Sequence, residues 1–166
     1  MALLNNKIGI IIKAIGGIYF VEAPDGVFEC KARGIFRKQE ISPCCGDNVE
    51  IEIENDSRGI IDAVSERKNL LIRPPLANLD QLVFVISSCE PAPNLTILDK
   101  FIAISEYKNI TPIIVITKVD LENVKEIVGI YEKVGISVFL ADNTTGEGSE
   151  NIREILQGKL SAFTGN

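Results

Sequence analysis

Four consecutive residues in the second half of the chain, Thr117, Lys118, Val119 and Asp120, combine side chains that could hold a purine base. One Asp carboxylate can accept two parallel hydrogen bonds, from the N1–H and the exocyclic N2 amine of guanine. Adenine has a lone pair at N1 instead, so a buried site of this kind discriminates by a factor on the order of 10⁴–10⁵. The stem of Lys118 can lie along the base while its ammonium group bonds nearby backbone or phosphate-loop groups. The pattern therefore predicts a guanine-nucleotide pocket.

The same residues also allow a purely structural interpretation. Asp is a preferred N-cap, so Asp120 could begin a helix over residues 121–134. That interpretation leaves Lys118 without a role. The motif follows an apolar run at 112–116, and ligands of open parallel sheets bind just beyond the carboxyl ends of such strands. We therefore favour base recognition over helix capping.

Two further segments could complete such a pocket. The loop at 141–148 begins with Ala141 and Asp142 and is small, polar and glycine-rich, so its backbone amides could meet the base carbonyl oxygen. The same composition is also that of an ordinary turn leading into a helix. The sequence ends at Gly165 and Asn166, immediately after an apolar run, where a phosphate-binding loop G-x-x-x-x-G-K-[ST] would begin.

A cluster of basic side chains in the first half could bind nucleic acid. Its members are Lys31, Arg33, Arg37 and Lys38. Phe28 and Phe36 flank the cluster, and basic side chains beside aromatic ones suit phosphate contact with base stacking. Four phosphate contacts give a salt slope of only about −3 to −4, enough to assist docking but not to hold RNA tightly. A solvated charged hairpin with Phe28 in the core is the structural alternative.

Composition excludes several kinds of site. The chain has no His, so a Ser-His-Asp triad, a Cys-His pair or a His-ligated zinc cannot form within it. The four Cys match no C-x-x-C spacing, and we expect free thiols in a reducing cytosol. They are Cys30, Cys44, Cys45 and Cys89.

Net charge and hydropathy limit the kinds of partner that the chain can have. The 17 Lys and Arg against 23 Asp and Glu give a net charge of −6, so no global basic field draws the chain to nucleic acid or membrane. The longest early apolar run, 8–12, is too short for a signal peptide or a spanning helix. We therefore expect a soluble cytoplasmic protein without membrane contact, whose RNA binding would need a local patch.

The first half of the sequence is typical of a small β-barrel. In one segment Val49, Ile51 and Ile53 alternate with glutamates, the period-2 signal of a strand with one wet face. The expected strands are 8–15, 18–22, 27–33, 48–54 and 59–64. Five strands at this spacing predict a closed or nearly closed barrel of OB or SH3-like type.

The pattern changes after Arg73, Pro74 and Pro75, which disfavour helix and should break strand pairing. Continuous apolar runs at 82–86, 112–116, 136–140 and 160–163 predict strands buried on both faces. Helical periodicity between them predicts helices over 94–108, 124–134 and 149–156, the first capped by Asn94 or Thr96 and the third by Ser149. We expect a parallel sheet covered by helices, and two domains, 1–73 and 74–166. The first domain has a net charge of −1 and the second of −5.

Seven ordered motifs together resemble the ribosome small-subunit-dependent GTPase A family (RsgA, also called YjeQ). They are CKARGIFRK (30–38), GDNV (46–49), RKNLLIRPP (67–75), NLDQ (78–81), ILDKF (97–101), PIIVITKVDL (112–121) and GKLSAFTGN (158–166). The resemblance covers essentially the whole chain. It implies a multi-domain protein in which an OB-type barrel precedes part of a circularly permuted GTPase domain, with a zinc-binding helical domain beyond it.

The resemblance also implies a function. Members hydrolyse GTP with Mg²⁺ when stimulated by the small ribosomal subunit, act late in maturation of that subunit and contact its ribosomal RNA. Thr117, Lys118 and Asp120, with Val119 between them, are expected to bind guanine, and Gly165 with Asn166 to open the phosphate loop. We expect a monomer.

The chain departs from the family pattern in two ways. Many GTPases have Asn where Thr117 stands, and the shorter hydroxyl should weaken base affinity without abolishing it. The sequence ends before the phosphate-loop Lys and Ser, the magnesium ligands and the zinc ligands, so we expect an amino-terminal portion with no catalytic or metal-binding residue of its own, inactive alone.

Two other functional classes fit parts of the sequence. One is a non-enzymatic OB-fold RNA-binding adaptor with a pseudo-nucleotide α/β domain. The other is an NAD-dependent enzyme, which the sequence disfavours because Ser87, Ser88, Cys89 and Glu90 occupy the turn where G-x-G-x-x-G would stand.

Overall fold

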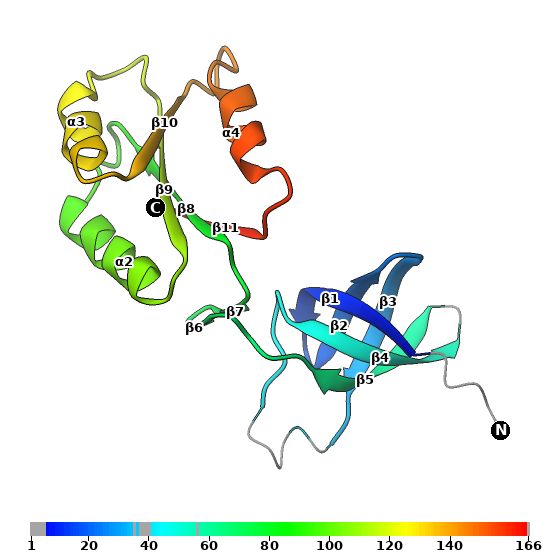
Figure 1. The fold of residues 1–166 in the computed structure, drawn as a ribbon. Coiled ribbons are helices and arrows are strands. Elements are labelled where there is room, and N and C mark those ends of the chain that lie inside the picture. The colour runs from blue at the N-terminus through cyan, green and yellow to red at the C-terminus, as the bar shows by residue number, and fades with distance from the viewer. Residues whose placement is uncertain (1–5, 35, 37–40, 56, 166) are drawn as a thin grey trace. The chain divides into compact units, whose positions relative to one another are not determined.

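The structure is a computed structural model that describes residues 6–34, 36, 41–55 and 57–165. The chain divides into two compact units, Met1–Asn78 and Leu79–Asn166. The first is built on strands and the second on alternating strands and helices (Figure 1), as the sequence predicts.

The first unit contains a closed barrel of five strands. These are β1 (Asn6–Ile15), β2 (Ile18–Ala23), β3 (Gly26–Ala32), β4 (Asn48–Asn55) and β5 (Arg58–Val64), in the order β1-β2-β3-β5-β4. β1 closes the barrel by pairing with β4, and β3 runs parallel to β5 while the other pairs are antiparallel. All five expected strands are confirmed. In β4 the alternation of side chains is that of a strand with one buried face.

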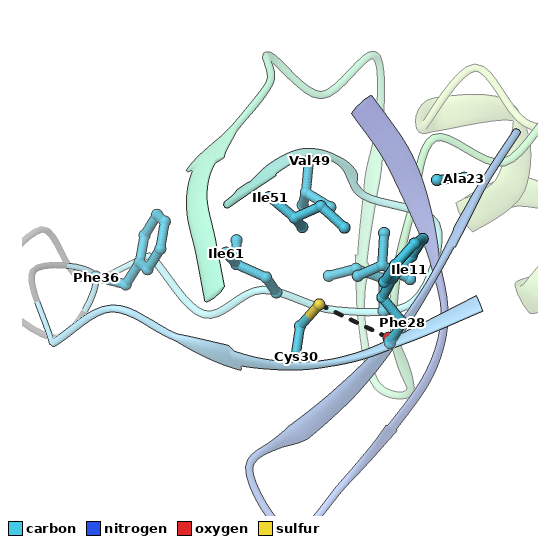
Figure 2. Packing of buried hydrophobic residues seen from close by; sticks show 9 residues of the cluster. Ile11, Ala23, Phe28, Cys30, Phe36, Val49, Ile51 and Ile61 are labelled. Carbon is cyan, nitrogen blue, oxygen red and sulfur yellow. Dashed lines mark hydrogen bonds between the residues drawn. The ribbon is translucent and has the colours of Figure 1, made fainter. Parts of the chain in front are cut away.

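Alternating side chains fill the barrel. Val49, Ile51 and Ile61 are fully buried, whereas the glutamates between the β4 residues lie on the outer face. Figure 2 shows these side chains converging with others from β1 and β3 on one interior. Phe28 and Phe36 belong to the same core.

A short hairpin follows the barrel. β6 (Leu70–Ile72) pairs antiparallel with β7 (Pro75–Ala77), so the expectation that this tract breaks strand pairing was wrong. Pro75 is the first residue of its strand, where its missing N–H costs no ladder hydrogen bond. The first unit reaches Asn78 and includes the hairpin, whereas the sequence places the boundary at residue 73.

A buried ion pair ties the barrel to the segment that leads into this hairpin. The fully buried Asp47 accepts hydrogen bonds from Nε of Arg67 at 2.7 Å and from Nη2 at 2.8 Å. It also accepts the backbone N–H of Cys44 at 2.8 Å. The side chain of Asn78 donates to the carbonyl of Gly46 at 2.9 Å, beside the pair. Two parallel N–H···O bonds fix both distance and orientation, so these contacts determine where the chain leaves the barrel.

The second unit has a four-stranded parallel sheet. Its strands are β8 (Gln81–Ser87), β9 (Thr111–Thr117), β10 (Ser137–Ala141) and β11 (Ser161–Gly165), in the order β10-β9-β8-β11. The helices are α2 (Leu95–Tyr107), α3 (Lys125–Lys133) and α4 (Ser149–Leu156). The predicted β-α-β-α-β-α-β order is confirmed.

The helices cover both faces of this sheet. On one face α4 contributes Ile152, Ile155 and Leu156 to a core that includes Val83 and Val115. On the other face α2 and α3 lie together (Figure 1), joined by a hydrogen bond between their side chains. The chain runs outward from β8 through β9 to β10 and then returns across the sheet to β11, on the other side of β8.

The helix starts differ in part from expectation. Asn94 caps α2, accepting the backbone N–H of Ile97 at 3.1 Å. The N-cap of α4 is Gly148 rather than Ser149. Gly148 adopts a φ of 83°, and a Cβ there would lie only 1.9 Å from the carbonyl oxygen of Leu140, so the position requires glycine.

Candidate functional site

Four chain segments meet at the carboxyl edge of the parallel sheet. They are the loops 88–94, 118–124 and 142–148 and the end of β11 at Gly165. Because parallel strands all end at the same edge, the topology gathers segments that are distant in sequence. The order of connections reverses between β8 and β11, and ligands of open α/β sheets bind at such a point.

The turn after β9 presents Asp120. The backbone N–H of Leu121 donates to the carbonyl oxygen of Lys118 at 3.1 Å, which closes a four-residue turn. The Asp120 side chain is exposed, and within the described residues its carboxylate has no hydrogen-bond or ion-pair partner. α3 begins only after Val124, so the interpretation of Asp120 as its cap is wrong. This carboxylate is free to accept two hydrogen bonds from a ligand.

The other residues of the motif are engaged with the neighbouring strand and loop. The Thr117 hydroxyl donates to the carbonyl of Ile86 at 3.2 Å, across to β8. Lys118 adopts a left-handed φ of 58°, and its Nζ donates to the carbonyl of Glu90 at 2.6 Å. Val119 is half-buried.

The loop after β10 is organised by its own acidic residue. The Asp142 carboxylate accepts the Thr145 hydroxyl at 2.8 Å and the Thr144 backbone N–H at 2.7 Å, and these bonds hold the pKa of Asp142 below its usual value. The Asp142 side chain is therefore used within the loop, so any ligand contact here would come from the backbone. Ala141 ends β10 directly opposite Thr117. The structure thus brings both parts of the expected base pocket together.

Gly165 lies at the end of β11, opposite Val85 of β8. A Cβ on Gly165 would lie 2.6 Å from the Val85 carbonyl oxygen, so only glycine allows this approach. The residue borders a cavity of about 50 Å³ that α2 lines with Ile97 and Phe101. Asn166, the other expected phosphate-loop residue, lies outside the described residues.

The basic cluster is only partly visible in the structure. Arg37 and Lys38 lie outside the described residues, and Lys31 is exposed on β3. Arg33 follows β3 and forms ion pairs with Glu52 of β4 and, at 2.5 Å, with Asp62 of β5. Acidic neighbours therefore offset part of the positive charge of this patch.

The aromatic residues beside the basic cluster are not available to a base. Phe28 and Phe36 are both buried in the barrel core, so neither ring can stack on a nucleotide. Tyr19 is half-buried and lines a groove together with Lys31, Arg33 and the buried Phe36.

Sequence reasoning gave the loop after β8 no role in the site. In the structure the Ser88 hydroxyl donates to the carbonyl of Lys118 at 2.7 Å, and the Ser88 N–H to that of Thr117 at 3.0 Å. The strand ends could have indicated this contact, since Ser87 and Thr117 end adjacent parallel strands in register. The residues that directly follow these two therefore start from neighbouring positions.

The described residues also bear on metal binding and membrane insertion. That part of the chain contains no group of three or more Cys, Asp and Glu side chains that could hold a metal ion. None of its helices is long and apolar enough to cross a membrane. The four cysteines are free thiols, and burial raises the pKa of both Cys30 and Cys44 to about 11.

Comparison with known proteins places both units. Residues 8–61 match the model of the RsgA N-terminal domain, and residues 64–166 match that of the RsgA GTPase. Among solved structures, YloQ, described as a circularly permuted GTPase, matches with a TM-score of 0.82 and 35% identity over 100% of this chain and 62% of that one. YjeQ from Thermotoga maritima matches with a TM-score of 0.83 and 31% identity over 97% of this chain and 60% of that one.

Curated relatives agree with these matches. The small ribosomal subunit biogenesis GTPase RsgA of Alkaliphilus metalliredigens is 44% identical over 162 residues, 95% of this chain and 56% of the relative. The protein of the same name from Caldanaerobacter subterraneus subsp. tengcongensis is 39% identical over 160 residues, 95% of this chain and 54% of the relative. The chain thus spans about half the length of the curated relatives it matches. With the barrel, the sheet order and two family models in agreement over nearly all of its residues, the chain belongs to the RsgA family.

Proposed function

We propose that this chain is the RNA-facing barrel and the base-recognition half of a GTP-binding protein that serves late maturation of the small ribosomal subunit. The observation that carries the proposal is the exposed carboxylate of Asp120, which has no partner within the described residues and lies at the carboxyl edge of the parallel sheet. The relatives' names, which pair GTPase with small-subunit biogenesis, support it.

The residues expected to contact the base have separate roles in this proposal. Asp120 accepts the N1–H and N2 amine of guanine, and the stem of Lys118 lies along the base. Thr117 already donates to Ile86, so it adds less to base affinity than an Asn would. The backbone of Ala141 and Asp142 faces the base carbonyl oxygen.

The phosphate end of the nucleotide belongs beside β11. Gly165 and Asn166 begin the phosphate loop, and GTP or GDP would bind there with Mg²⁺. Phosphoryl transfer in such proteins depends on positioning and electrostatic stabilisation. The described residues supply the positioning of the base, and the whole protein supplies GTP hydrolysis stimulated by the ribosomal subunit.

The remaining proposals concern the whole protein. Its barrel would contact ribosomal RNA through Lys31, Arg33, Arg37 and Lys38. We further propose a zinc-binding domain beyond this chain, a cytoplasmic location and a monomeric state.

Nucleotide binding by the full-length protein tests the proposal. We expect GTP and GDP to bind, ATP not to bind, and Asp120→Ala to abolish guanine binding. The matched control is Glu122→Ala, which removes an exposed carboxylate two residues away. Failure of GTP and GDP to bind at roughly millimolar ligand would overturn the proposal and favour the non-enzymatic RNA-binding adaptor. A dissociation constant in that range corresponds to a binding free energy of about −4 kcal/mol.

A further inference from the structure

We infer that Ser88 is a positioning residue for guanine recognition, because its hydroxyl holds the turn that carries Asp120. The inference rests on the nucleotide site proposed above. Ser88 lies one residue beyond β8 and is only 5% exposed. It contacts the motif at two carbonyl oxygens, that of Thr117 through its N–H and that of Lys118 through its hydroxyl.

One oxygen atom links Ser88 to the Asp120 turn. The Ser88 hydroxyl donates to the Lys118 carbonyl oxygen at 2.7 Å, and the N–H of Leu121 donates to the same oxygen at 3.1 Å. A carbonyl has two lone pairs, so it can serve both donors. The bond from Leu121 closes the turn with Val119 and Asp120 at its centre. The hydroxyl therefore connects the Lys118 carbonyl oxygen, which closes the turn, to the residue that follows β8.

The backbone of Lys118 needs such support. Its φ of 58° is a left-handed conformation, which is unfavourable for a residue with a Cβ and persists where surrounding contacts hold it. The loop after β8 holds this residue at both ends, through the Ser88 hydroxyl on its carbonyl and the Glu90 carbonyl on its ammonium group. Of these two contacts, the one from Ser88 acts directly on the backbone.

Loss of the hydroxyl should act on base selectivity. The Lys118 carbonyl would lose its bond from Ser88, and the turn would be free to relax. Asp120 must align two oxygens with two donors of guanine, and hydrogen bonds weaken steeply with misalignment. The N2 amine is the donor that hypoxanthine lacks. Misplacement of Asp120 should therefore weaken guanine binding more than hypoxanthine binding.

The experiment compares GDP and IDP affinities of the full-length protein. Ser88→Ala removes the hydroxyl, Ser88→Cys replaces it with a slightly larger thiol that is a poor donor, and Ser88→Thr keeps a hydroxyl. The control is Ser105→Ala, which removes a buried hydroxyl bonded within α2 to Phe101. We expect Ser88→Ala and Ser88→Cys to lower GDP affinity about tenfold and IDP affinity about threefold or less. Ser88→Thr should stay near the wild type, and Ser105→Ala should leave the ratio unchanged.

A second readout separates this inference from the proposed function. In the nucleotide-free full-length protein, the three-bond HN–Hα coupling of Lys118 reports its φ, and Ser88→Ala should move it away from the left-handed value. An unchanged coupling, or equal loss of GDP and IDP affinity, would overturn the inference while the nucleotide site stands. A wild-type protein that binds no guanine nucleotide would overturn the proposed function and with it the link to guanine.

Discussion

Two aspartates, one in each unit, show how the same side chain serves different purposes. Asp47 in the first unit is fully buried and accepts hydrogen bonds from Arg67 and from the Cys44 backbone. Asp120 in the second unit is exposed and has no partner within the described residues. The fold uses the first carboxylate, whereas the second remains available to a ligand. Pairing, more than residue type, distinguishes the structural aspartate from the one that we propose binds guanine.

The largest expected effect comes from breaking the paired aspartate. Asp47→Ala leaves the Arg67 charge and a buried Cys44 N–H without their acceptor, and should lower the free energy of unfolding of the barrel by about 3 kcal/mol. Urea unfolding measures this. Asp62→Ala, which removes one exposed partner of Arg33, should cost at most about 1 kcal/mol. Equal losses of unfolding free energy in the two variants would contradict the structural role of the buried, paired Asp47.

Pairing within the second unit should affect stability alone. The buried Tyr131 hydroxyl donates to the exposed Asp99 carboxylate at 2.8 Å, joining α3 to α2. Tyr131→Phe should therefore lower the free energy of unfolding by about 1–2 kcal/mol. Guanine affinity should not change, in contrast to the Asp120 variants. Thermal unfolding measures this loss, and Tyr107→Phe, which changes a ring that is 83% exposed, is the control. A Tyr131→Phe variant as stable as Tyr107→Phe would show that the bond to Asp99 does not stabilise the fold.

The strands and their connections were predictable because the signals are local. Alternation in 48–54 and the apolar run 112–116 specify strands without reference to partners. The N-cap at Gly148 was missed because it depends on the backbone of Leu140, which approaches from β10. The pairing of Pro75 with Ile72 was missed because a proline can occupy the first position of a strand, where no ladder N–H is needed. The same holds for the site. Asp120 could be singled out from its motif, whereas the contact from Ser88 comes from a neighbouring loop.

The basic cluster of the barrel offers a smaller test of the difference between paired and unpaired charges. Arg33→Ala together with Arg37→Ala should weaken binding to the small ribosomal subunit without unfolding the barrel. Because Arg33 is paired with Glu52 and Asp62, its contribution should be modest, and the salt slope should fall by at most about 2. Affinities measured at about 50 and 200 mM salt give this slope. Affinity unchanged at both would remove the cluster from the interface.

The smallest effect concerns pH. Hydrogen bonds from Thr145 and Thr144 lower the pKa of Asp142 from its usual 3.8, so its contribution to stability is present at neutral pH and lost as pH falls through the lowered value. Asp142→Asn should therefore lower the free energy of unfolding near pH 7 and make it decrease less steeply below about pH 4. Urea midpoints across this range check the slope. An unchanged slope would show that Asp142 does not organise its loop.

A change of base preference would show whether the carboxylate of Asp120, unpaired within the described residues, recognises guanine. Asp120→Asn replaces one acceptor oxygen with an amine that can donate to the C2 carbonyl of xanthine, while the other oxygen still accepts N1–H. Affinities of the full-length protein for GDP and XDP are the measurement. We expect the wild type to prefer GDP and the variant to prefer XDP, each by at least about tenfold. A variant that still prefers GDP would contradict it.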